Sequence, residues 1–142
     1  MYAIYHDFTI NVPKERVFKA ISLPNELNNW WTKRCSGTPE LGAVYNFYFA
    51  EEYNWFAEIS ILKHDEQVEF KMTKATAEWL PTSFGFILKE INLTTTSVEF
   101  YHKDWTEVSK EYRVTNYCWA NLLRQMKKYL EKGTITPFEQ RN

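Results

Sequence analysis

The chain has 142 residues, 44% of them hydrophobic and 25% charged, which is enough for one domain with a buried core. Its 17 basic and 18 acidic side chains give a formal net charge of −1, so it lacks the basic surplus on which nucleic-acid binding depends. No apolar run approaches the roughly 20 residues that span a bilayer, and we therefore expect neither a nucleic-acid nor a membrane partner.

The cysteines and the first residues favour a reducing compartment. Cys35 and Cys118 are too few and too far apart for a disulfide framework or a paired-cysteine site. The first seven residues lack the basic and then apolar layout of a signal peptide. We expect one cytoplasmic domain over residues 1–142, without a cofactor.

The first elements predicted are a strand and two short helices. Residues 4–12 alternate apolar and polar side chains, the period typical of a half-buried strand. Prolines precede or open the helices expected at 14–22 and 25–31, where their fixed φ suits the first turn. Two glycines and a proline then predict a loop over 32–42.

Five further strands follow, separated by short polar turns and by one longer loop at 73–81. Short connections between consecutive strands favour antiparallel pairing. Strand parity places Glu58, Glu69 and Glu99 on the outer face, which argues against two carboxylates meeting in one cleft. The strands are expected at residues 43–50, 55–62, 68–72, 82–91 and 96–102.

The last third of the chain predicts one long amphipathic helix over 111–132, ended by Gly133. A single long helix after a run of strands must lay its apolar side on their sheet, and a pocket often remains between the two. The apolar positions with helical spacing are Trp119, Leu122, Leu123, Met126, Tyr129 and Leu130.

The order of these motifs resembles the START/Bet v 1-like superfamily, and more closely the family related to the C-terminal domain of the activator of the Hsp90 ATPase. The resemblance covers nearly the whole chain. It is carried by Pro13-x-x-x-Val17-Phe18-x-Ala20-Ile21, Pro24-x-Glu26-x-x-x-Trp30-Trp31, Gly42 before an aromatic strand, Thr96-x-Val98-x-Phe100-x-His102, and Trp119-x-x-x-Leu123-x-x-Met126.

This resemblance implies an α+β helix-grip fold, with a curved antiparallel sheet wrapped around the long C-terminal helix and two short helices after the first strand. It also implies an interior cavity for lipids, polyketides, hormones or other apolar molecules. Some such proteins perform cyclisation or hydrolysis in the cavity, and others bind a chaperone. Two positions depart from the family pattern: Cys118 and Asp104 stand where glycine is common, and Cys118 narrows the gap between helix and sheet.

The first hypothesis for function is a binding protein for a small apolar ligand. The ligand would lie between the aromatic inward face of the sheet and the long helix, held mainly by burial of its carbon surface. The side chains expected to contact it are Trp30, Phe47, Phe49, Ile59, Phe70, Phe86, Phe100, His102, Cys118, Leu122 and Met126.

Two alternatives come from other classes of function. One is a chaperone-binding domain, as monomer or homodimer. The other is a cavity enzyme of the cyclase or hydrolase type, in which His102 acts as acid or base. We expect a binding protein rather than an enzyme.

Several side chains have both a functional and a structural interpretation. His6 and His102 share the inward parity of strands that pair in the resembled fold, and each is either a polar anchor for a ligand or a hydrogen-bonded core histidine. Two histidines alone do not complete a zinc site, so no metal is expected. Cys118 is either a nucleophile or an apolar filler. Of Trp30 and Trp31, helical spacing predicts one inside and one partly exposed.

Overall fold

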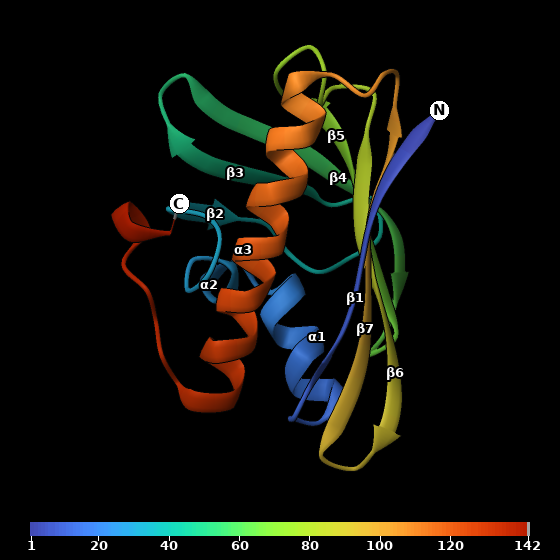
Figure 1. The fold of residues 1–142 in the computed structure, drawn as a ribbon, viewed down its shortest axis with the longest axis vertical. Coiled ribbons are helices and arrows are strands. Elements are labelled where there is room, and N and C mark those ends of the chain that lie inside the picture. The colour runs from blue at the N-terminus through green and yellow to red at the C-terminus, as the bar shows by residue number, and fades with distance from the viewer. Residues whose placement is uncertain (142) are drawn as a thin grey trace.

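The computed structural model describes residues 1–141 and contains one seven-stranded antiparallel sheet beneath a long helix (Figure 1). The strand order is β1-β7-β6-β5-β4-β3-β2, so β1 and β2 form the two edges. The strands are β1 (Tyr2–Ile10), β2 (Arg34–Ser36), β3 (Val44–Ala50), β4 (Tyr53–Lys63), β5 (Gln67–Lys74), β6 (Ser83–Asn92) and β7 (Thr95–Trp105).

Four helical segments accompany the sheet within residues 1–141. The long helix α3 (Lys110–Lys132) runs along one face of the sheet, and α1 lies beside its C-terminal half (Figure 1). The order after β1 is two short helices, then the strands, then α3, which confirms the predicted helix-grip fold. The shorter segments are α1 (Lys14–Ser22), α2 (Pro24–Leu27) and the 3-10 turn η1 (Phe138–Gln140).

The ends of α3 show why the chain becomes helical there. Ser109 precedes the helix, and its side chain accepts a hydrogen bond from the Tyr112 amide at 3.2 Å, which satisfies one of the free N–H groups of the first turn. Gly133 ends the helix with φ of 71°, a left-handed conformation that costs glycine least. The helix predicted at 111–132 is therefore confirmed to within one residue.

Two local predictions are wrong. The expected loop at 32–42 contains the edge strand β2, whose three residues are too few to show a period of two; Cys35 pairs with Phe47 of β3. The second helix stops at Leu27 rather than at residue 31. Because Trp30 and Trp31 lie in a turn beyond it, helical spacing does not separate them, and both are buried, at 1% and 5% exposure.

The core between sheet and helices is built largely from aromatic rings in contact with one another. Phe70 and Phe84 stack with centroids 5.2 Å apart, and Phe86 meets Phe100 edge-on at 5.1 Å. Trp119 of α3 lies 4.5 Å from Phe100. Pairs at these separations are attractive beyond simple burial, so they hold the middle of α3 close to the sheet.

Candidate functional site

Most of the side chains predicted to contact a ligand fill the core beneath the middle of α3. Each of these is no more than 1% exposed, so the broad hollow expected under the helix is occupied by protein. They line neither of the two pockets described below. The residues so placed are Trp30, Phe47, Ile59, Phe70, Phe86, Phe100, His102 and Met126.

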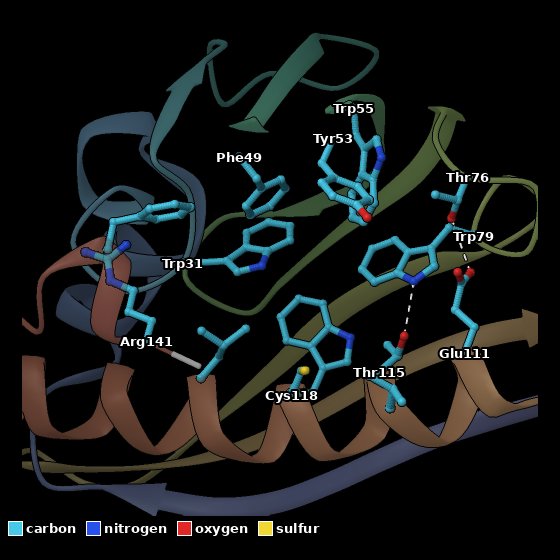
Figure 2. A pocket seen from close by; sticks show the side chains of 14 residues that line it. Trp31, Phe49, Tyr53, Trp55, Thr76, Trp79, Glu111, Thr115, Cys118 and Arg141 are labelled. Atoms are coloured by element: carbon cyan, nitrogen blue, oxygen red, sulfur yellow. Dashed lines mark hydrogen bonds between the residues drawn. The ribbon is translucent and has the colours of Figure 1, made fainter. Parts of the chain in front are cut away.

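A pocket of about 380 Å³ remains at the N-terminal half of α3, and we call it the aromatic pocket (Figure 2). Phe49, Cys118 and Leu122 are the three predicted ligand contacts that line it. The volume lies within the range of small-molecule sites. Its other lining residues are Trp31, Tyr53, Trp55, Thr76, Trp79, Glu111, Val114, Thr115, Trp119, Phe138 and Arg141.

Five separate segments form the walls of the aromatic pocket. α3 supplies one wall, and Figure 2 shows the Cys118 sulfur on the side of this helix that faces the rings. The hairpin of β3 and β4 supplies a second wall, and the loop between β5 and β6 a third. The turn after α2 contributes Trp31, and residues 138–141 close one end. The site thus depends on tertiary structure rather than on one sequence motif.

The four tryptophans of the aromatic pocket form a continuous row. Trp55 lies 4.5 Å from Trp79 between ring centroids, Trp79 lies 6.2 Å from Trp119, and Trp119 lies 5.1 Å from Trp31. Trp79 is fixed in place because its indole N–H donates to the Thr115 hydroxyl at 3.2 Å (Figure 2). A row of large rings with few polar atoms is typical of a site for apolar ligands.

These tryptophans were not among the predicted ligand contacts. The sequence signal for Trp55 and Trp79 was limited to the high aromatic content, 18% of the chain, and to positions at a strand end and in a loop. Trp31 was assigned to the second short helix and Trp119 to the apolar side of the long helix. Trp31 lines the pocket whereas its neighbour Trp30 lies in the core, where the Trp30 indole donates to the Ala20 carbonyl at 2.9 Å. Sequence alone does not distinguish the two.

His102 lies in the core with both ring nitrogens engaged. The Trp119 indole N–H can only donate, so Nδ1 of His102 accepts this bond at 3.0 Å and carries no proton. Nε2 therefore holds the proton and donates to the Thr82 hydroxyl at 2.8 Å, which in turn donates to the Trp79 carbonyl at 2.6 Å. Burial lowers the pKa of His102 from 6.5 to about 3, so the ring is neutral at pH 7. This network supports the structural interpretation of His102.

His6 does not meet His102, although β1 and β7 are neighbours. In their register Ile4 pairs with His102, and His6 pairs with Phe100. The His6 ring stacks on Phe100 with centroids 6.2 Å apart. The two imidazoles therefore form no joint site.

Cys118 faces the aromatic pocket as a free thiol. Burial raises its pKa above 9.0, which disfavours the thiolate that nucleophilic chemistry needs. The side chain is therefore best described as part of the apolar wall. Within residues 1–141, no group of three or more His, Cys, Asp or Glu side chains is arranged to hold a metal ion.

Arg141 holds the C-terminal segment, residues 134–141, against one end of the aromatic pocket through hydrogen bonds. Its guanidinium donates to the carbonyls of Asn28, Thr32 and Thr136 at 2.8, 3.2 and 2.9 Å. The Arg141 carbonyl accepts from the Asn121 side chain of α3 at 2.6 Å. These bonds hold Phe138 and the residues around it against the pocket.

A second groove of about 510 Å³ lies between β1 and the C-terminal half of α3. Its lining includes Arg124, Lys127, Lys128 and Lys132, whose long solvated side chains make it a less suitable site for an apolar ligand. No helix within residues 1–141 is both long and apolar enough to cross a membrane.

Comparison with known families gives one match, covering residues 11–131. The matching family is described as Activator of Hsp90 ATPase homolog 1-like protein. The match includes both short helices, strands β2 to β7 and almost all of α3, and it ends before the segment pinned by Arg141. Comparison with curated proteins gave no match.

Solved structures of similar fold include the Aha1 dimer from Colwellia psychrerythraea, with a TM-score of 0.85 and 26% identity over 94% of this chain and 99% of that one. The protein SSP2350 from Staphylococcus saprophyticus gives a TM-score of 0.78 and 22% identity, over 95% and 96% of the two chains. The di-domain ARO/CYC protein BexL from the BE-7585A biosynthetic pathway gives 0.78 and 15%, over 92% of this chain and 47% of that chain.

Proposed function

The chain belongs to the Activator of Hsp90 ATPase homolog 1-like family, and from this premise we propose that it binds a small, mainly apolar ligand in the aromatic pocket. The observation that supports the proposal is a space of about 380 Å³ bordered by four tryptophans in a protein whose core is otherwise filled. A ligand there would gain roughly 25 cal/mol for each Å² of apolar surface removed from water.

The position of the pocket differs from the one expected before the structure. The ligand would lie against the N-terminal half of α3, touching Phe49, Cys118 and Leu122 but not the deeply buried members of the predicted set. A catalytic role for His102 has no support from the geometry, because its ring is 0% exposed and lies outside the pocket lining.

Intrinsic tryptophan fluorescence tests the proposal, since Trp31, Trp55, Trp79 and Trp119 all border the pocket. Titration with fatty acids, sterols and aromatic metabolites should change the emission for at least one class and raise the melting temperature. No change of either signal with any class would contradict the proposal.

A pair of variants on α3 locates the binding site. Cys118→Phe adds a ring on the pocket side of the helix and should weaken binding at least about tenfold, a loss near 1.4 kcal/mol. Asn116→Phe adds the same ring on the exposed side and serves as the control. Equal binding by both variants would place the ligand elsewhere.

A chaperone ATPase is the second candidate partner. It is favoured by the similarity to the Aha1 dimer, which spans 94% of this chain. A pull-down with purified Hsp90 and a measurement of its ATPase rate test this function, and no capture together with an unchanged rate would exclude it. Light scattering on the same preparation distinguishes a monomer from a homodimer.

A further inference from the structure

One carboxylate borders the aromatic pocket without a basic partner. Glu111 lies in the first turn of α3, and its Oε2 accepts a hydrogen bond from the Thr76 hydroxyl at 3.2 Å (Figure 2). The ion pairs found within residues 1–141 involve other carboxylates and not Glu111. The pocket wall therefore carries a negative charge that the surrounding protein does not neutralise.

The surroundings of Glu111 disfavour this charge. Burial raises the pKa of the Glu111 carboxyl, the hydrogen bond from Thr76 partly offsets that effect, and the nearby charge of Glu78 raises the pKa further. The dipole of α3 stabilises the negative charge of Glu111, which lies in the first turn of the helix. Glu78 lies in the loop between β5 and β6, so no helix dipole stabilises its charge. Glu111 is the acidic side chain that lines the pocket, and the charge of Glu78 acts on it from outside that lining.

The positive side chain at the other end of the pocket is Arg141. Arg141 uses Nε, Nη1 and Nη2 to donate to three backbone carbonyls, which fixes the C-terminal segment. The guanidinium of Arg141 therefore has a structural role. Arg141 is only 4% exposed, whereas Glu111 is half-buried, so Glu111 is the more accessible of the two charges.

The aromatic walls suit a cation as well. Tryptophan has the ring face that attracts cations most strongly, and cages of such rings are a recurring way to recognise ammonium groups. Trp55 packs on Trp79 with centroids 4.5 Å apart, and Trp79 donates to Thr115, which lies one turn along α3 from Glu111. Trp79 and the Glu111 carboxylate therefore lie at the same end of the pocket (Figure 2).

We propose that the ligand of the aromatic pocket is an apolar molecule carrying an ammonium group, which pairs with Glu111 and lies against the tryptophan faces. This inference rests on the proposed function, because it names the chemical class of the molecule that the pocket binds. The apolar part of the ligand would lie further along the pocket, toward Leu122 and Phe138.

Three probes of similar size separate this inference from the proposed function. Benzyltrimethylammonium carries the cation, neopentylbenzene is its neutral isostere, and phenylacetate carries an anion. Tryptophan fluorescence should report binding of the ammonium at least about tenfold tighter than that of the neutral isostere. Tighter binding of phenylacetate, or equal binding of all three, would overturn the inference and leave the proposed function standing. No binding of any probe would contradict both.

Variants then assign the effect to Glu111. Glu111→Gln keeps an acceptor for Thr76 but removes the charge, and it should weaken ammonium binding about tenfold while leaving the neutral isostere unaffected. Glu107→Gln removes an exposed charge just before α3 and is the control. Trp55→Leu should weaken the ammonium more than the isostere. An equal loss for both probes in Glu111→Gln, with unfolding in urea unchanged, would overturn the assignment.

Discussion

Lowering the pH should destabilise the folded protein through His102. Its ring is 0% exposed and neutral, with its two nitrogens bonded to Trp119 and Thr82. Burial holds the pKa at about 3 in the folded protein, against 6.5 for an exposed histidine. Below pH 6.5 the unfolded chain therefore takes up a proton that the folded protein does not. The contribution of His102 to stability is complete above that pH and falls as the pH decreases toward 3.

The size of the effect follows from the same two pKa values. When only the unfolded state takes up a proton, the free energy of unfolding falls by about 1.4 kcal/mol for each unit by which the pH is lowered. Lowering the pH to two units below the ordinary histidine pKa should therefore reduce the free energy of unfolding by about 2.7 kcal/mol. That loss is a large fraction of the 5–15 kcal/mol, roughly, that stabilises a typical domain.

The assay compares wild type with His102→Gln by urea unfolding from neutral pH down to about pH 4.5, where the proton linkage of the wild-type histidine is strong. Glutamine does not titrate, so carboxylates shared by the two proteins cancel in the difference. The wild type should be the more stable at neutral pH, and its advantage should shrink by about 1.4 kcal/mol per pH unit below 6.5. Parallel pH profiles for the two proteins would refute the description of His102 as a buried neutral ring.

Three further substitutions test the packing. Gly85→Ala should destabilise by about 1–3 kcal/mol in urea unfolding, because the new Cβ would lie 2.6 Å from the Tyr101 hydroxyl and 2.7 Å from a backbone carbonyl. Arg141→Gln should remove hydrogen bonds that hold residues 134–140 in place, and amide exchange in these residues should become faster without global unfolding. Ser109→Ala removes the cap at Tyr112 and should cost about 0.5–2 kcal/mol of unfolding free energy. An unchanged value in any of these measurements would contradict the contact concerned.

The fold was largely predictable because its strands and long helix carry strong periodic patterns. Alternation in β1 and β3 to β7 identified their inward faces, and the apolar stripe from Trp119 to Met126 identified the buried side of α3. The strand β2 was not predictable, since three residues carry no measurable period. Its place at the sheet edge depends on pairing with β3.

The site was less predictable because parity shows which way a side chain points but not what fills the space in front of it. Phe47 and Phe49 share one face of β3, yet Phe47 is completely buried among rings whereas Phe49 borders the pocket. Parity likewise placed Glu69 on the outer face, but it is only 5% exposed because Ser60, Tyr101 and Lys103 bond to its carboxylate. Such outcomes depend on neighbours brought together by the fold.

Native mass spectrometry of the purified protein tests the central claim most directly, namely that the aromatic pocket holds a small apolar molecule. We predict a ligand mass on the wild type and on Asn116→Phe, and its loss from Cys118→Phe, whose added ring occupies the pocket. The same ligand mass retained by Cys118→Phe, with its fold intact by circular dichroism, would contradict the account.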